Sequence, residues 1–339
     1  MHSDEGIMRA DPATPGLSGA ENLREAPPGA SRAIHWFAWL TALATLCLLI
    51  AGALVVGHDA GLAVPDWPLS FGTWMPPMEG GVFYEHGHRM IAAMVGLLTT
   101  VLAVWLGWKD SRRWVKKLAA AAWVAVVVQA ILGGLTVLYL LPVPILIAHA
   151  CLAQIFFCMV LSLVLVTSPA WERAGNSPAT APGQGFEQLA AVATGALFLQ
   201  LVLGALFLQL VLGAAVRHKA LGVGPHLIGA AVVGFLVGCV CYRAVTELGE
   251  RDDVRKLARW VGGFLALQLI LGVASYMLRG FAEESAQPVP LFILLTTAHV
   301  AVGAVLLGSS LMLTVLAYRR LAVSGKVSSL AGSPQRTLA

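Results

Sequence analysis

Four histidines lie inside apolar segments, where an imidazole needs a partner. They are His88, His149, His226 and His299. A lone histidine in an apolar helix is more often a satisfied core residue than a ligand, but polar side chains inside a membrane are costly and usually functional. The surrounding sequences correspond in pairs: HRMIAAMVGLL matches HLIGAAVVGFL, and IAHACLA matches TAHVAVG. The pattern therefore indicates two equivalent pairs of metal ligands.

The expected metal is haem iron, because two imidazoles that face each other across a helix bundle suit a metal with two axial positions. Zinc usually requires three or four protein ligands close together, and no carboxylate or thiolate set repeats with the histidines in both halves. Small residues at Ala92–Ala93 and Gly229–Ala231 follow two of the histidines and leave room for a flat macrocycle. Simple helix packing explains these small residues equally well.

One carboxylate distinguishes the two halves. Glu85 precedes His88 by three residues in the segment EHGHR, so the two side chains share one face of a helix. The three residues before His226 read VGP and contain no acid. We expect proton-coupled chemistry in the half with Glu85, and electron transfer or a structural role in the other half. The simpler alternative for Glu85 is a carboxylate favoured by the helix N-terminal dipole.

Three arginines lie near the same helix ends as these histidines. Arg89, Arg217 and Arg279 are candidates for charge-assisted bonds to haem propionates. The alternative is that they are ordinary interfacial side chains exposed to water.

The segment GLAVPDWPLSFGTWMPP, residues 61–77, is apolar for a loop. Trp67 and Trp74 fit an interfacial aromatic belt, and the four prolines stiffen the segment. We expect this loop to lie over the first four helices and to shield a bound apolar ligand.

The elements that position these residues are predicted to be membrane-spanning helices. Of the 339 residues, 58% are hydrophobic and 12% are charged, and the mean hydropathy is +0.78. A helix of about 20 apolar residues crosses a bilayer, and in lipid each such segment must satisfy its own backbone. The fold class is therefore all-α integral membrane, with eight transmembrane helices as two pseudo-symmetric four-helix bundles. The expected spans are 35–57, 86–108, 117–139, 144–167, 188–216, 224–246, 257–279 and 290–318.

An internal repeat of four helices accounts for the two halves. The segments that begin at Gln129 and Gln268 also correspond, in the same order as the histidine segments. The repeat is parallel, because an even number of helices returns the chain to the same side. A shorter duplication, GALFLQLVL at 195–203 and again at 204–212, is interpreted as a slip duplication absorbed by a helix end.

The expected domains are a disordered cytoplasmic tail (1–34), an N-terminal four-helix half (35–167), a cytoplasmic linker (168–187), a C-terminal four-helix half (188–318) and a cytoplasmic tail (319–339). Lys and Arg concentrate in 109–117 and 243–259, and neither occurs from His58 to His88. This distribution predicts a multi-pass cell-membrane protein with cytoplasmic termini and histidine sites toward the external side. It argues against a nucleic-acid partner. The five cysteines all lie in apolar segments, so no disulfide is expected.

Together these features resemble the haem A synthase family of bacteria and mitochondria over about residues 35–318. The resemblance rests on the segment GLAVPDWP, the EHGHR motif and three further helix histidines in two four-helix halves. It implies an enzyme that oxidises the C8 methyl of haem O to a formyl group by two hydroxylations and loss of water. The product, haem A, serves terminal oxidases.

The resemblance also assigns roles to residues. It implies that His88 and His149 bind the substrate haem O, that His226 and His299 are axial ligands of a haem b cofactor, and that Glu85 is the essential acid. It implies haem O synthase, cytochrome oxidase assembly and membrane lipid as partners, and leaves a homo-oligomer open. One departure is the absence of the loop cysteine pair that many members carry, so a mechanism that needs those thiols is in doubt here.

Two other functions are compatible with the same residues. One is a non-catalytic di-haem b cytochrome that passes electrons from quinol, and the other is a haem carrier or assembly factor. Glu85 discriminates between them and the synthase, because a pure electron carrier should tolerate Glu85→Gln with its haem content intact. A carrier would return haem O unchanged.

Overall fold

The structure, a computed structural model, describes residues 32–175, 186–247 and 252–331. Within these ranges the chain forms nine helices and, apart from one isolated bridge between Ser70 and Thr73, no strand pairing. Eight helices are long and apolar enough to cross a membrane, which confirms the predicted all-α membrane class. The helices are α1 (Arg32–Gly57), α2 (Gly80–Lys109), α3 (Arg113–Leu138), α4 (Val143–Val166), the short α5 (Pro169–Gly175), α6 (Phe186–Arg217), α7 (Gly224–Glu247), α8 (Asp252–Glu284) and α9 (Pro290–Ala331).

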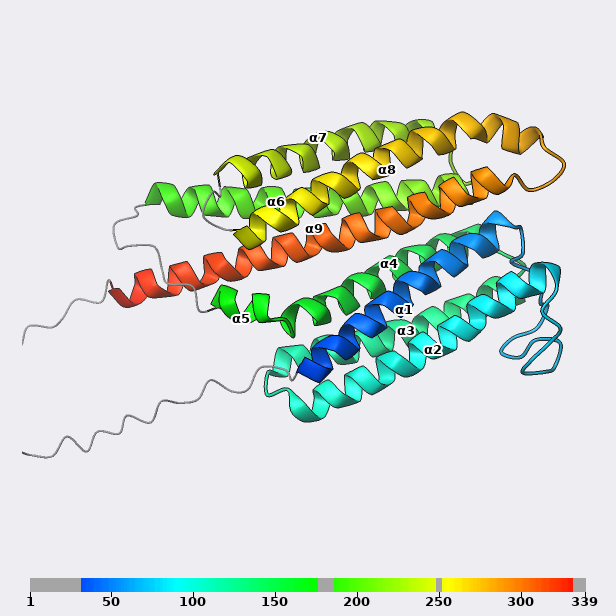
Figure 1. Cartoon of the computed structure of the whole chain (residues 1–339), viewed down its shortest axis with the longest axis horizontal. Coiled ribbons are helices and arrows are strands. Elements are labelled where there is room, and N and C mark those ends of the chain that lie inside the picture. The colour runs from blue at the N-terminus through cyan, green and yellow to red at the C-terminus, as the bar shows by residue number, and fades with distance from the viewer. Residues whose placement is uncertain (1–31, 176–185, 248–251, 332–339) are drawn as a thin grey trace, which may run out of the picture.

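The long helices form two groups that lie side by side (Figure 1). In the first group α1 contacts α2 and α4, and α3 contacts α2 and α4; in the second, α6 contacts α7 and α9, and α8 contacts α7 and α9. Helices α1 and α4 of the first group also contact α9, and α4 contacts α6. The predicted pseudosymmetry between the groups stays a prediction.

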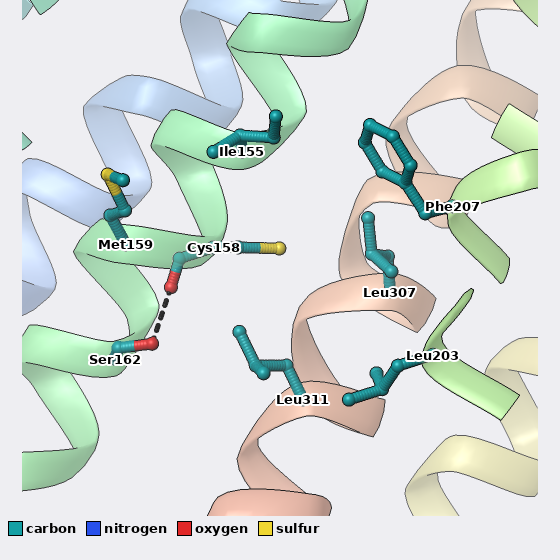
Figure 2. A pocket seen from close by; sticks show the side chains of 8 residues that line it. All are labelled: Ile155, Cys158, Met159, Ser162, Leu203, Phe207, Leu307 and Leu311. Atoms are coloured by element: carbon teal, nitrogen blue, oxygen red, sulfur yellow. Dashed lines mark hydrogen bonds between the residues drawn. The ribbon is translucent and has the colours of Figure 1, made fainter. Parts of the chain in front are cut away.

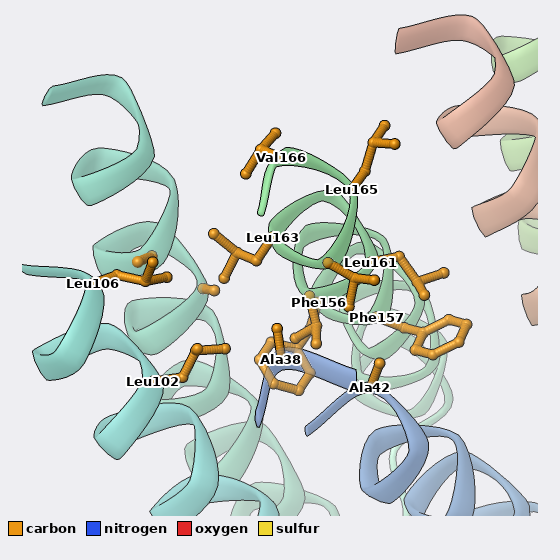
Figure 3. Close-up of a cluster of buried hydrophobic side chains, with 14 of the residues drawn as sticks. Ala38, Ala42, Leu102, Leu106, Phe156, Phe157, Leu161, Leu163, Leu165 and Val166 are labelled. Atoms are coloured by element: carbon orange, nitrogen blue, oxygen red, sulfur yellow. The ribbon is translucent and has the colours of Figure 1, made fainter. Parts of the chain in front are cut away.

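The first group has an apolar core between α1, α2 and α4 (Figure 3). Ala38 of α1, Leu102 of α2 and Phe156 of α4 are almost completely buried. Between helices in lipid, such contacts stabilise by close van der Waals packing. A similar contact joins the two groups, because a Cβ on Gly57 would lie 2.8 Å from Cγ2 of Ile293 on α9. Glycine at this position therefore permits α1 and α9 to approach closely.

Several helices begin or end away from the predicted boundaries. Helix α2 begins at Gly80, six residues before the predicted span at 86, so that the EHGHR motif lies within the helix. Helix α5 occupies part of the predicted linker, and α9 continues to Ala331, past the expected end at 318. Hydropathy locates only the lipid-facing part of a helix, and polar turns extend it beyond the membrane. Most of the predicted N-terminal tail lies outside the described residues, and the domain boundaries stay predictions.

Candidate functional site

Each of the four predicted haem ligands packs against a glycine of the preceding helix. The imidazole Cε1 atom lies so close to the glycine that a Cβ there would force the ring or the helix to shift. The distances between an ideal Cβ and the imidazole Cε1 are 3.1 Å for Gly52 and His88, 3.3 Å for Gly133 and His149, 3.0 Å for Gly213 and His226, and 3.0 Å for Gly272 and His299.

A glutamine one helical turn before the glycine contacts three of these histidines. Its side-chain amide reaches the histidine ring, the histidine carbonyl oxygen or both, so it fixes the position of the ligand from the neighbouring helix. In α1 the equivalent position is Leu48, so the His88 site has no such amide. The Nε2 of Gln129 lies 2.9 Å from the carbonyl oxygen of His149. The Nε2 of Gln209 lies 2.8 Å from the carbonyl oxygen of His226 and 3.0 Å from the Nδ1 of His226. The Nε2 of Gln268 lies 3.2 Å from the Nε2 of His299.

Sequence reasoning missed Gln209 and Gly213, which belong to the second copy of the nine-residue duplication and the residues just after it. The signal was available as glutamine followed four residues later by glycine, a spacing that also occurs on α3 and α8. In the first copy, Gln200 is also four residues before a glycine, Gly204. That glycine has nothing within 4 Å of its ideal Cβ. Nine residues correspond to two and a half turns, so the two copies present opposite faces of α6. Among the described side chains, Gln209 of the second copy and the glycine just after it, Gly213, contact His226.

The two histidines of the second group face each other. The ring centroids of His226 and His299 are 6.3 Å apart and the ring planes are inclined by 79°. Metal–imidazole bonds of about 2 Å on either side of one iron would place two ring centroids about 6 Å apart. The Nδ1 of His299 is also buried without a hydrogen-bond partner. The residues therefore fit an iron held between two imidazoles.

The first group contains the other two histidines, His88 on α2 and His149 on α4. The Nδ1 atoms of His88 and His149 are both buried and have no hydrogen-bond partner. Their buried, unpartnered nitrogens and the glycines beneath their rings fit a second haem. Among the described residues, no three His, Cys, Asp or Glu side chains gather as a metal site.

Glu85 is buried, with 4% of its surface exposed, and both of its carboxylate oxygens are engaged. Oε1 accepts a 2.6 Å bond from Nη2 of Arg89, one turn along α2, and Oε2 accepts a 2.8 Å bond from the backbone N–H of Val64. Nη1 of Arg89 donates to the carbonyl oxygens of Asp66 and Leu69, at 2.7 and 2.8 Å. Glu85 and Arg89 thus join α2 to the loop between α1 and α2.

The same loop has further polar contacts. Ser70 Oγ and His86 Nδ1 share a 2.8 Å hydrogen bond, and the His86 Nε2 is buried without a partner. Asp66 accepts hydrogen bonds from the backbone N–H groups of Phe71 and Gly72, at 2.7 and 2.8 Å. The bond from Gly72, and then that from Phe71, hold the pKa of the Asp66 carboxyl below its usual value. The loop is therefore ordered by its own turn and by α2.

Trp67 connects this loop to the first helix group by packing against α3. A Cβ on Gly134 of α3 would lie 2.7 Å from the indole Cδ2, so the ring lies directly on the glycine. The residue before it, Gly133, is the one that contacts His149. The expectation that the loop covers the first group is consistent with this contact. Trp74 projects outward and is 81% exposed.

The three predicted propionate partners all have protein partners. Arg89 pairs with Glu85, and Arg279 forms a 2.7 Å ion pair with Glu283 near the end of α8. Arg217 is at the end of α6 and donates a 2.6 Å bond to the carbonyl oxygen of Ala53 on α1. Arg217 therefore links the two helix groups beside Gly52, the glycine beneath His88. The propionate contacts stay predictions.

An apolar groove of 280 Å³ lies between α4, α6 and α9 (Figure 2). Cys158, which lines it, follows His149 by nine residues and so faces the opposite side of α4. The groove is therefore separate from the histidine site of the first group. Cys158 and the other four cysteines are free thiols, in agreement with the expectation of no disulfide.

Comparison with known proteins places this site in a family. The model of the cytochrome oxidase assembly protein family COX15-CtaA matches residues 78–225. A haem A synthase of Symbiobacterium thermophilum is 32% identical over 247 residues, which cover 67% of this chain and 80% of that protein. Haem A synthases of Geobacillus kaustophilus and Roseobacter denitrificans are 32% identical over 139 and 169 residues, which cover 44% and 42% of those proteins.

The chain thus aligns with less than half of two of these relatives and with four fifths of the third. The residues that the family model matches include Glu85, Arg89, His88 and His149, and they end one residue before His226. The extent and identity of the Symbiobacterium match show that this chain belongs to the haem A synthase family.

Proposed function

We propose that the protein oxidises the C8 methyl of haem O to a formyl group and so makes haem A. The proposal is supported by membership of the family and by two pairs of partly buried imidazoles suited to haem. We assign the first helix group to the substrate, bound through His88 and His149. We assign the second group to a haem b cofactor, bound through His226 and His299.

One observation carries this division of labour. The first group has a buried carboxylate, Glu85, three residues before its histidine, whereas Val223 is three residues before His226. A buried negative charge beside a substrate that loses electrons stabilises the positive charge that develops there. A site that only carries electrons has no such requirement, which fits the apolar residue in the second group.

The residues of the chain contribute binding, charge and exclusion of water. His88 and His149 hold the substrate iron, and Glu85 serves as an acid/base group or as the stabilising negative charge. Arg89 holds the carboxylate in place, and the loop above it keeps water from the reacting carbon. When bound, haem b supplies a one-electron centre that accepts or relays the electrons taken from the methyl.

The location follows from the same assignment. Eight candidate spans make this a multi-pass membrane protein. We propose the cell membrane, with both termini cytoplasmic and the histidine sites near the external side, because the basic residues concentrate in the opposite loops. Haem O synthase would supply the substrate, and cytochrome oxidase assembly would consume the product.

The test is to express the chain with a haem O synthase and to identify the bound haems by HPLC and mass spectrometry. Haem A, haem O and haem B are expected from the native chain. Glu85→Gln should retain haem O and lose haem A, whereas His226→Ala should lose haem B first. Only haem O and haem B in the native chain, under conditions that support oxidases, would leave the cytochrome or carrier function in place of the synthase.

A further inference from the structure

The loop between α1 and α2 is held at two places on either side of Trp67. On one side, the backbone N–H of Val64 donates to Glu85 at 2.8 Å. On the other, the carbonyl oxygen of Leu69 accepts from Arg89 at 2.8 Å. The backbone before and after Trp67 is therefore fixed by the same ion pair on α2, which leaves the indole little freedom to move.

The indole itself is held between this loop and α3. Gly134 has no side chain to separate it from the ring, and an ideal Cβ there would lie 2.7 to 3.0 Å from three indole atoms. The preceding residue, Gly133, is 3.3 Å from Cε1 of His149 by the same measure. Trp67 and His149 therefore pack against consecutive residues of one helix.

The indole is also available to a ligand. Trp67 is 39% exposed although its loop is fixed and one part of its ring rests on α3. An aromatic ring that is held rigidly and partly uncovered next to a metal ligand is suited to contact a flat macrocycle, because aromatic rings interact through stacked or edge-on contacts. A tryptophan that only anchors the protein at a membrane interface requires neither a fixed loop backbone nor a glycine beneath its ring.

We propose that Trp67 is a positioning residue for the substrate haem, forming the wall beside His149 that the macrocycle contacts. The Glu85–Arg89 pair then has a second task, which is to hold this wall in place. The inference rests on the proposed function, because it takes the first helix group as the substrate site. It adds a residue and a surface that the histidines and Glu85 do not provide.

The simpler alternative is that Trp67 is an interfacial anchor. The chain offers a matched control, since Trp74 lies in the same loop and is 81% exposed. A second control concerns the glycine beneath the ring. Gly96 lies within helix α2 and has nothing within 4 Å of an ideal Cβ, so Gly96→Ala should be harmless where Gly134→Ala is not.

The experiment measures haem O binding by absorbance titration on the full-length protein purified with haem b. Trp67→Leu and Gly134→Ala should each weaken haem O binding by about threefold to tenfold, the range expected for one aromatic contact. Trp67→Phe should retain most of the affinity, because it keeps an aromatic face. Trp74→Leu and Gly96→Ala should bind haem O like the native chain.

Hydrogen exchange of residues 61–77 provides a readout independent of haem. Glu85→Gln should increase exchange there, because the carboxylate holds the loop. In the double variant, Trp67→Leu with Glu85→Gln, the affinity for haem O should fall by less than the product of the two single decreases. Equal affinities for the Trp67→Phe, Trp67→Leu and native chains would overturn the role of Trp67 and leave the synthase proposal standing. If the native chain binds no haem O in its first half, both proposals fail.

Discussion

His226 and His299 come from α7 and α9 and face each other with ring centroids 6.3 Å apart and ring planes 79° from parallel. Each ring rests on a glycine of the helix before it, so the separation of the rings is set by the packing of backbone against imidazole. A ligand pair positioned in this way depends on helix contacts at least as much as on the histidines themselves.

Adding one methyl group beneath either ring should reduce haem b content. A Cβ at Gly213 or Gly272 would lie 3.0 Å from the imidazole Cε1, and crowding of this kind typically destabilises by about 1–3 kcal/mol. We expect Gly213→Ala and Gly272→Ala to lower the haem b to protein ratio, measured by pyridine haemochrome absorbance. Gly238→Ala is the control, since that position has nothing within 4 Å. Equal haem content in all three variants would contradict the packing argument.

The duplicated segment of α6 provides an internal control for the role of glutamine. Gln209 donates 2.8 Å and 3.0 Å bonds to the carbonyl and Nδ1 of His226, whereas Gln200, at the same place in the first copy, is exposed. Gln209→Leu should weaken haem b retention by roughly 0.5–1.5 kcal/mol, the usual contribution of a hydrogen bond. Gln200→Leu should have no effect. Haem loss during gel filtration distinguishes the two, and similar loss in both variants would refute a specific role.

Arg217 should stabilise the contact between the two helix groups. Its guanidinium donates a 2.6 Å bond to Ala53 across the groups, and breaking a buried hydrogen bond to a charged donor typically destabilises by about 1.5–3 kcal/mol. Arg217→Ala should therefore lower the thermal midpoint in detergent. Arg279→Ala breaks only an ion pair on one helix, and its midpoint should stay close to that of the native protein. A similar decrease in both variants would show that the link does not join the groups.

The loop turn at Asp66 should be insensitive to pH over the physiological range. Hydrogen bonds from Gly72 and Phe71 lower the pKa of this carboxyl in the folded protein, so its stabilising effect is complete above the unfolded value of about 3.9 and is lost only as the pH falls through the folded value. Amide protection of Gly72, corrected for intrinsic exchange, should stay level from about pH 5 to about pH 8. Asp66→Asn should reduce it throughout. A loss between about pH 6 and pH 7 would indicate control by a histidine instead.

The sequence was sufficient to predict eight candidate spans, because they depend on apolar patterns that the membrane makes unambiguous. The roles of the four histidines stay predictions. It did not locate the start of α2 at Gly80, since the polar EHGHR segment is accommodated by the loop and not by lipid. The partners of Glu85 were also out of reach. Val64 lies 21 residues away and contributes a backbone group, which carries no sequence signal.

The glutamines illustrate a different gap. Gln129 and Gln268 were noticed as repeat markers, but their function depends on a contact with the next helix that spacing along one helix does not reveal. Gln209 and Gln200 occupy the same place in the two copies of the duplication, so the sequence alone does not distinguish them. Only the arrangement in space shows which copy is used.

The loop between α1 and α2 is held by an ion pair, hydrogen bonds and one indole on a glycine, while all five cysteines are free thiols. The loop therefore needs no oxidative folding catalyst to form, and thiol reductants such as dithiothreitol do not break the contacts that hold it. The loop thus forms the same contacts in a reducing environment as in an oxidising one.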